Sequence, residues 1–260
     1  SAIAANAAAL AAATNGRFGF LTPGGNTVGG YLAGATPGVG GLTAEKMLES
    51  PLKGYIVLHA EPAFDADNGT RAIETLKAAG FVVALTSYRS AAQEYADVML
   101  PVAPFTETSG TFVNAEGRVQ SFKGVAAPLA DTRPAWKVLR VLGNLLELSG
   151  FDDESSESVR DAVLSGDVSS RLNNAVARQP AVLEPAAGTI ERVTDLPIYR
   201  SDAIVRRAEA LQQTPASQAP AARMSSATLS KLGIEADAAV RVGTGQGSVV
   251  LPVPLDDRVA

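Results

Sequence analysis

The sequence contains no cysteine and only one histidine, His59. Without cysteine, these 260 residues cannot form disulfides, use a thiolate in catalysis or ligate an iron–sulfur cluster. A single histidine also argues against a conventional zinc site, because such sites combine several cysteine and histidine ligands. We therefore expect no metal site and no thiolate catalysis in this chain.

Aromatic residues and basic clusters are scarce as well. Aromatics make up only 5% of the chain, and the net charge is −5, from 22 basic and 27 acidic residues. Nucleic-acid-binding surfaces concentrate Lys and Arg, with aromatic side chains where bases stack. The composition therefore predicts no nucleic-acid partner.

One long stretch, Phe18–Ala44, has no charged residue. It contains nine glycines and two prolines, which interrupt any helix long enough to cross a bilayer. We expect a strand followed by a long loop here, and no membrane span.

Short runs of Val, Ile, Leu and Phe are abundant. Such runs, with little alternation of polar and apolar residues, are typical of strands buried on both faces in a parallel sheet. Four of them predict strands, at Arg17–Thr22, Gly54–Ala60, Phe81–Ser87 and Asp97–Val102.

Helix-length segments alternate with these runs, at Thr43–Ser50, Thr70–Ala79 and Ser90–Ala96. Strands and helices that alternate in this way indicate βαβ units. The predicted fold class is therefore α/β, with a doubly wound, mostly parallel sheet and flanking helices.

After Phe122 the pattern becomes helical. The clearest helix follows Pro134, with Val and Leu at helical spacing until Gly150. Further helices are predicted at Ser155–Leu164, Ser169–Ala177 and Asp202–Gln212.

Composition divides the chain into three parts. Residues 1–213 are predicted to form the α/β domain with its helical C-terminal part, and residues 214–226, rich in Pro, Ala and Ser, a linker. Residues 227–260 begin a β-rich segment with a short helix and a hairpin, and a lone hairpin is marginally stable. Because the chain starts at Ser1 without a methionine and stops after a strand, we expect it to be part of a longer polypeptide.

Nucleotide-binding motifs are incomplete. The chain has no Walker loop, and PGVGG at Pro37–Gly41 lacks the third glycine of the dinucleotide fingerprint. His59 lies at the carboxyl end of the predicted strand Gly54–Ala60, the edge where α/β sheets bind ligands. Glu61, Asp65 or Asp67 could orient it as a general base. The alternative is a histidine that only hydrogen-bonds a loop backbone.

Patterns for hydrolytic chemistry are incomplete too. Glu107 and Glu116 could act as a carboxylate pair, but nothing in the sequence fixes their separation. No GxSxG elbow is present, and Ser109 has no histidine partner that the sequence identifies.

The most distinctive stretch is FTETSGTFVNAEGRVQSF, Phe105–Phe122. Strand-forming residues flank Asn114–Gly117, which predicts a hairpin with its turn there. Glu116 and Arg118 would then form a weak surface ion pair. Residue chemistry alone leaves open whether this polar hairpin lines a site or is only a surface element.

The same stretch resembles the signature of the molybdopterin oxidoreductase superfamily, in which an ADVvLP strand and a glutamate precede GTFxNxEGRxQ. Together with TRPAWKVLRVLGNLL, NTVGGYLAG and EPAFD, it most resembles the G subunits of bacterial NADH:quinone oxidoreductase, respiratory complex I. The resemblance extends from Arg17 to the end of the chain and is most specific over residues 90–146.

The resemblance implies that the sheet belongs to a domain beside a pterin cofactor and that residues 227–260 open a β-barrel. In a molybdenum enzyme of this superfamily, six residues would lie in a loop near the cofactor: Gly110, Thr111, Asn114, Glu116, Arg118 and Gln120. The complex I subunit binds no molybdopterin in this part, so there these residues would be a structural remnant.

For function, the resemblance implies a structural part of a complex that passes electrons from NADH to quinone. The chain would hold no cofactor, and the iron–sulfur clusters would lie in an N-terminal part of the subunit outside these residues. That part and other hydrophilic-arm subunits would be its partners, peripherally bound on the cytoplasmic side of the bacterial inner membrane. The alternatives are the cofactor-binding part of a catalytic molybdopterin-dependent oxidoreductase and an unrelated α/β ligand-binding module.

Overall fold

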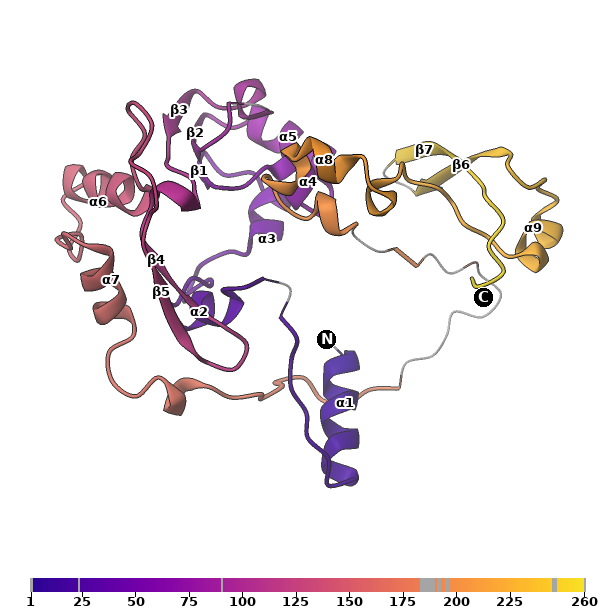
Figure 1. Ribbon diagram of the computed structural model, residues 1–260, viewed down its shortest axis with the longest axis horizontal. Coiled ribbons are helices and arrows are strands. Elements are labelled where there is room, and N and C mark those ends of the chain that lie inside the picture. The colour runs from indigo at the N-terminus through magenta and orange to yellow at the C-terminus, as the bar shows by residue number, and fades with distance from the viewer. Residues whose placement is uncertain are drawn as a thin grey trace. The chain divides into compact units, whose positions relative to one another are not determined.

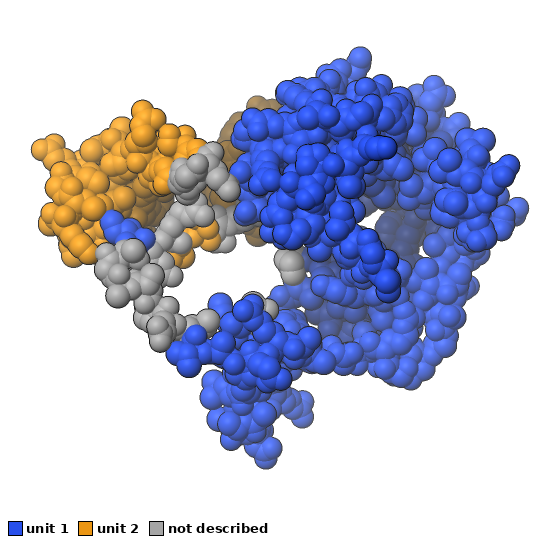
Figure 2. Space-filling model, turned by 180° about the vertical axis from the view of Figure 1, so that it is seen from behind, with its two compact units in different colours: residues 1–192 blue, residues 193–260 orange. Residues whose placement is uncertain are grey.

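The computed structural model of the protein describes residues 2–22, 24–89, 91–182, 190, 193–194, 197–244 and 247–259. Contacts between Cα atoms divide the chain into two compact units, residues 1–192 and residues 193–260 (Figures 1 and 2). Residues 214–226 fall inside the second unit, and the three-part division drawn from composition stays a prediction.

A parallel three-stranded sheet, in the order β1-β2-β3, carries a buried hydrophobic cluster of the first unit (Figure 1). The strands are β1 (Gly54–Leu58), β2 (Phe81–Thr86) and β3 (Val98–Pro101). They confirm three of the four predicted strands and the α/β fold class.

The fourth predicted strand, Arg17–Thr22, is wrong. The segment has no regular secondary structure and does not join any strand that the structure describes. The rings of Phe18 and Phe20 instead contact each other edge to face, 4.9 Å apart.

Helices cover one face of the sheet. Leu76 of α5 (Gly69–Lys77) and Ala92 of the 3₁₀ helix η1 (Ala91–Glu94) pack with Val82 and other buried side chains of the sheet. The helices α3 (Ala44–Glu49) and α4 (Pro62–Asp65) contact α5.

Two of the three helix predictions for this part are confirmed. Both Thr43–Ser50 and Thr70–Ala79 are confirmed, by α3 and α5. The segment Ser90–Ala96 is only the short η1, and its first residue lies outside the described residues.

A hairpin of β4 (Gly110–Val113) and β5 (Val119–Phe122) follows the sheet, as predicted, after the 3₁₀ helix η2 (Phe105–Glu107). In Figure 1, α2 lies beside this hairpin. The other helices of the first unit are α1 (Ala2–Ala13), α2 (Thr27–Leu32), α6 (Ala135–Leu145) and α7 (Ser156–Val163).

The predictions that α6 and α7 are helices are confirmed, but the helix predicted at Ser169–Ala177 is wrong. Only the 3₁₀ helix η3 (Ser169–Arg171) forms there, and the chain leaves it with extended backbone at Leu172. Beyond η3, Leu172 lies against Gly117, and the Asn174 side chain donates a hydrogen bond to the Phe18 carbonyl.

The second unit begins with short turns of helix and ends in a hairpin. The helix predicted at Asp202–Gln212 is broken into two pieces, whereas the predicted short helix and hairpin are confirmed. Its elements are η4 (Ile198–Arg200), η5 (Val205–Arg207), α8 (Glu209–Gln212), η6 (Pro215–Ser217), α9 (Ser226–Leu232), β6 (Ala239–Thr244) and β7 (Gly247–Pro252).

The strands β6 and β7 pair with each other and close no barrel within the described residues. No described helix in either unit combines the length and the apolar character that crossing a membrane requires.

Candidate functional site

The turn of the β4–β5 hairpin is organised by the side chain of Asn114. Its Oδ1 atom accepts hydrogen bonds from the backbone N–H groups of Glu116 (3.1 Å) and Arg118 (2.9 Å). The Gly117 N–H donates to the Asn114 carbonyl at 2.9 Å. A side chain that bonds to its own loop in this way stabilises a turn locally.

Two glycines of the hairpin have no room for a side chain. Gly117 has φ +80°, and a Cβ atom there would lie 2.0 Å from Cδ1 of Leu172. At Gly110, a Cβ atom would lie 2.8 Å from the ring of Phe122. Both positions therefore need glycine for packing, and Gly117 needs it for its backbone as well.

Asn26, just before α2, fixes the hairpin from one side. Its Oδ1 accepts a hydrogen bond of 2.8 Å from the backbone N–H of Val113 in β4. Close approach is possible because residue 29 is glycine, where a Cβ atom would lie 2.0 Å from that oxygen. The sequence indicated no role for Asn26, since its partner is 87 residues away.

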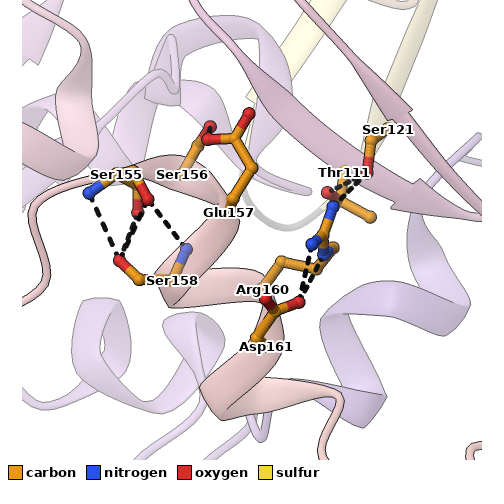
Figure 3. A network of polar contacts seen from close by, with 8 residues as sticks. All are labelled: Thr111, Ser121, Ser155, Ser156, Glu157, Ser158, Arg160 and Asp161. Carbon is orange, nitrogen blue, oxygen red and sulfur yellow. Dashed lines mark hydrogen bonds and ion pairs between the residues drawn. The ribbon is translucent and has the colours of Figure 1, made fainter.

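A polar network joins the hairpin to α7 (Figure 3). Thr111 and Ser121 face each other across the two strands, with their hydroxyl oxygens 2.9 Å apart. Arg160 of α7 donates to the Ser121 hydroxyl at 3.2 Å and pairs with Asp161 at 2.7 Å. At the start of α7, the side chains of Ser155 and Ser158 form a capping box.

Arg171 links two of the surrounding helices. Its guanidinium donates to the Val163 carbonyl at the end of α7 (3.0 Å) and to the Leu32 carbonyl at the end of α2. The next residue, Leu172, lies against Gly117 of the hairpin turn. Sequence reasoning missed this link, because Arg171 and Leu32 are 139 residues apart.

The six predicted cofactor-loop residues all lie on this hairpin, but they do not converge on a cavity. Thr111 and Asn114 bond within the hairpin, and Gly110 packs under Phe122. The side chains of Glu116 and Arg118 are largely exposed, with their charged atoms 3.9 Å apart, and Gln120 is also exposed.

A cleft of about 650 Å³ lies next to the hairpin, and none of the six residues lines it. Its charged lining is balanced, with three acidic and three basic side chains: Glu107, Glu154, Glu157, Lys123, Arg133 and Lys137. Glu107 accepts a hydrogen bond from the Leu129 N–H (2.9 Å), and Arg133 donates to two backbone carbonyls. The cleft therefore shows no preference for a ligand of one charge.

The proposed carboxylate pair receives no support from these surroundings. Glu107 lines the cleft, whereas Glu116 lies in the hairpin turn and pairs with Arg118. Among the described residues, no group of three or more His, Asp or Glu side chains is placed to hold a metal ion.

His59 follows β1 at the carboxyl edge of the sheet, with φ 51°. Its backbone N–H donates to the Leu85 carbonyl at 2.9 Å. The ring is partly open to solvent, yet the protein around it removes enough water to lower the pKa of His59. Burial raises the pKa of Tyr95, and the charges of Glu61 and Asp65 add to that effect.

Comparison with known proteins identifies relatives of this fold. The family model of the molybdopterin oxidoreductases matches residues 1–145. The G subunit of the NADH-quinone oxidoreductase of Streptomyces coelicolor is 31% identical over 227 residues, which are 84% of this chain and 27% of that protein. A putative formate dehydrogenase of Staphylococcus aureus is 39% identical over 72 residues, 28% of this chain and 7% of that protein.

Among solved structures, the acetylene hydratase from Pelobacter acetylenicus superposes with a TM-score of 0.50 and 17% sequence identity. The match covers 81% of this chain and 37% of that chain, and it concerns the fold alone. The chain thus spans well under half the length of each of these proteins.

Proposed function

The chain belongs to the molybdopterin oxidoreductase family, and from that membership we propose that it is a structural part of a protein like the G subunit of NADH-quinone oxidoreductase. The whole protein transfers electrons from NADH toward quinone through iron–sulfur clusters outside residues 1–260. The chain by itself catalyses no reaction. Family membership excludes the third possibility, an unrelated α/β ligand-binding module.

The observation that supports this proposal most is the extent of the similarity. The likeness to the G subunit runs along 84% of the chain, whereas the likeness to the formate dehydrogenase is confined to 28% of it. Similarity that includes the helices and the second unit argues for the same kind of protein more strongly than one shared segment does.

The use of the hairpin side chains supports a structural role. The Asn114 side chain and the Thr111 hydroxyl form bonds within the hairpin, and Asn26 and Arg160 attach it to α2 and α7. A side chain that bonds to its own turn is less free to bind a ligand. The partners are the remainder of the same polypeptide and its neighbours in the hydrophilic arm, peripherally bound on the cytoplasmic side of the bacterial inner membrane.

The second candidate is the cofactor-binding part of a catalytic molybdopterin-dependent oxidoreductase. It is favoured by the 39% identity to the putative formate dehydrogenase. The six residues expected near a pterin do not fit that group as the described part of the chain arranges them, since none lines the cleft and Asn114, Glu116 and Arg118 bond to one another.

The test is to purify the protein at its natural length from its source and to analyse metals, pterin and activity together. We expect iron without near-stoichiometric molybdenum, tungsten or pterin, and co-migration with NADH-oxidising activity in native electrophoresis. Near-stoichiometric molybdenum and pterin would favour the second candidate. In the assembled protein, Arg118→Ala should leave NADH–quinone activity unchanged, whereas a catalytic cofactor loop would lose activity.

A further inference from the structure

Residues 164–177, here called the strap, follow α7 in an irregular path. The strap contains the single turn η3 and otherwise no regular secondary structure. In Figure 1 it is the segment that leaves the end of α7. Within the described chain, its backbone N–H groups donate hydrogen bonds to backbone carbonyls of the strap and of α7 alone. Side chains therefore attach the strap to the other segments of the first unit.

The central attachment is made by the side chain of Arg171. Its Nη1 atom donates to the Val163 carbonyl at 3.0 Å, and its Nη2 atom donates to the Leu32 carbonyl. These carbonyls belong to the last residues of α7 and α2. The last carbonyls of a helix have no partner within it, and the helix dipole favours a cation there. One guanidinium therefore joins the ends of two helices.

Two neighbouring side chains attach the strap at further points. Leu172 lies against Gly117 in the turn of the β4–β5 hairpin, where the missing Cβ atom leaves room for it. Asn174 donates a hydrogen bond of 3.3 Å from its side chain to the Phe18 carbonyl. Together with Arg171, these side chains attach the strap to α2, to the hairpin and to the segment before α2.

The attachments complete a closed ring around the hairpin. Asn26 bonds the start of α2 to β4, and Arg160 bonds α7 to Ser121 of β5. Arg171 joins the far end of α2 to the end of α7. Within the described chain, Arg171 is the one side chain whose hydrogen bonds connect these two helices directly. Its loss would open the ring.

We propose that the strap is a latch that opens and closes as one unit, separately from the parallel sheet, and that its closure holds the hairpin turn in place. Segments that depend on a few exposed contacts open locally at a lower free energy than the whole protein. Arg171 and Asn174 are exposed, and the hydrophobic cluster of the sheet is built from residues between Tyr55 and Met99. The latch is a property of residues 1–260 and holds for either candidate function.

The test measures hydrogen–deuterium exchange by mass spectrometry in the protein at its natural length. Three peptides are followed: the strap, the hairpin turn at residues 114–118, and β2 of the sheet. Arg171→Ala removes both bonds to the helix ends. Leu172→Ala is a second variant, which keeps Arg171 and shortens the side chain against Gly117. Arg178→Ala, at an exposed arginine just beyond the strap, is the matched control.

In Arg171→Ala, we expect exchange of the strap and of the hairpin turn to become faster together, by about tenfold or more, because charged hydrogen bonds are lost from the closed state. Exchange of β2 should stay as in the parent. Leu172→Ala should give the same pattern with a smaller factor. Arg178→Ala should exchange like the parent in all three peptides.

Faster exchange of the strap without the hairpin turn would overturn the inference, because the strap would not hold the turn. An equal increase in all three peptides would also overturn it, because the sheet would then open together with the strap. Unchanged exchange in Arg171→Ala would exclude Arg171 as the latch contact. Should Arg171→Ala fail to fold, Leu172→Ala decides by the same comparison of the three peptides.

Discussion

At the scale of single residues, Gly117 is where the hairpin turn is most sensitive to substitution. Gly117→Ala meets two penalties: a positive φ, worth about 1–2 kcal/mol, and a Cβ atom 2.0 Å from Leu172, worth about 1–3 kcal/mol as overpacking. We expect the free energy of unfolding to fall by the sum of these, about 2–5 kcal/mol. Urea unfolding followed by the fluorescence of the single tryptophan, Trp136, measures it.

Gly150→Ala is the matched control for this substitution. Gly150 has φ +84°, but a Cβ atom there would meet nothing within 4 Å. Only the backbone penalty remains, so the expected loss is about 1–2 kcal/mol. Equal losses in the two variants would show that Leu172 moves aside without cost.

The lowered pKa of His59 predicts that the stability of the fold depends on pH. Its pKa in the folded state is lowered below the ordinary 6.5 by desolvation. As the pH falls through 6.5, the imidazole of His59 is protonated in the unfolded state before it is protonated in the folded state. The contribution of His59 to the free energy of unfolding is therefore fully present above pH 6.5 and decreases below it. We expect the urea concentration at the unfolding midpoint to depend less on pH in His59→Asn than in the parent, between about pH 8 and pH 5. In this range histidine alone titrates among unperturbed side chains.

Asparagine is chosen because it tolerates the positive φ of this position better than most residues do. His59 is the single histidine, so no second imidazole complicates the comparison. A variant whose midpoint falls as steeply as that of the parent would assign the pH dependence to other groups.

At the scale of elements, Asn26 joins α2 to β4. Asn26→Ala leaves the N–H of the buried Val113 without its acceptor, which costs about 1–3 kcal/mol. Asn26→Asp keeps an oxygen in the same place, and we expect it to lose clearly less. Denaturant titration of both variants measures the difference. Equal losses would show that the amide group itself, and not its acceptor oxygen, is required.

Elements with a strong local signal could be predicted from the sequence. The strands β1, β2 and β3 follow from Val and Leu runs, α6 from apolar spacing, and the hairpin from the turn at Asn114–Gly117. In each case the signal and the structure it specifies lie within one short segment.

Elements that depend on distant partners could not be predicted from the sequence. Arg17–Thr22 has strand-like composition, but a strand needs a neighbour for its hydrogen bonds. The Phe18 carbonyl instead accepts from the side chain of Asn174 at 3.3 Å. The predicted helix Ser169–Ala177 contains both Leu172 and Asn174. Leu172 lies against Gly117 and has an extended backbone, and Asn174 bonds to Phe18. Tertiary contacts thus outweigh local propensity in both segments.

The candidate site shows the same division. The six hairpin residues could be named in advance because they share one short motif. Asn26 and Arg171 could not, since their partners are 87 and 139 residues away. The sequence gives one weak indication for Asn26. Residue 29, three positions later, is glycine, and the close approach of the Asn26 side chain requires a glycine there.

At the scale of the whole molecule, each unit leaves apolar side chains exposed on its strands. In the second unit, Val249 and Val250 of β7 are neighbours whose side chains point to opposite faces of the strand. Both are more than half exposed, so both faces of this hairpin are open. Because β6 and β7 form a two-stranded sheet, each has a neighbouring strand on one side only, as far as the structure describes the chain.

Open strand edges pair readily with other chains, and lysine on an edge strand opposes this pairing. We therefore expect residues 1–260 to self-associate as concentration rises, and Val250→Lys to shift the association to higher concentration. Val39→Lys adds the same charge to an exposed loop residue outside the sheets and should leave the association unchanged. Sedimentation velocity over a concentration series measures all three proteins. A parent chain that stays monomeric throughout the series would contradict the prediction. An equal effect of both lysines would assign the change to net charge alone.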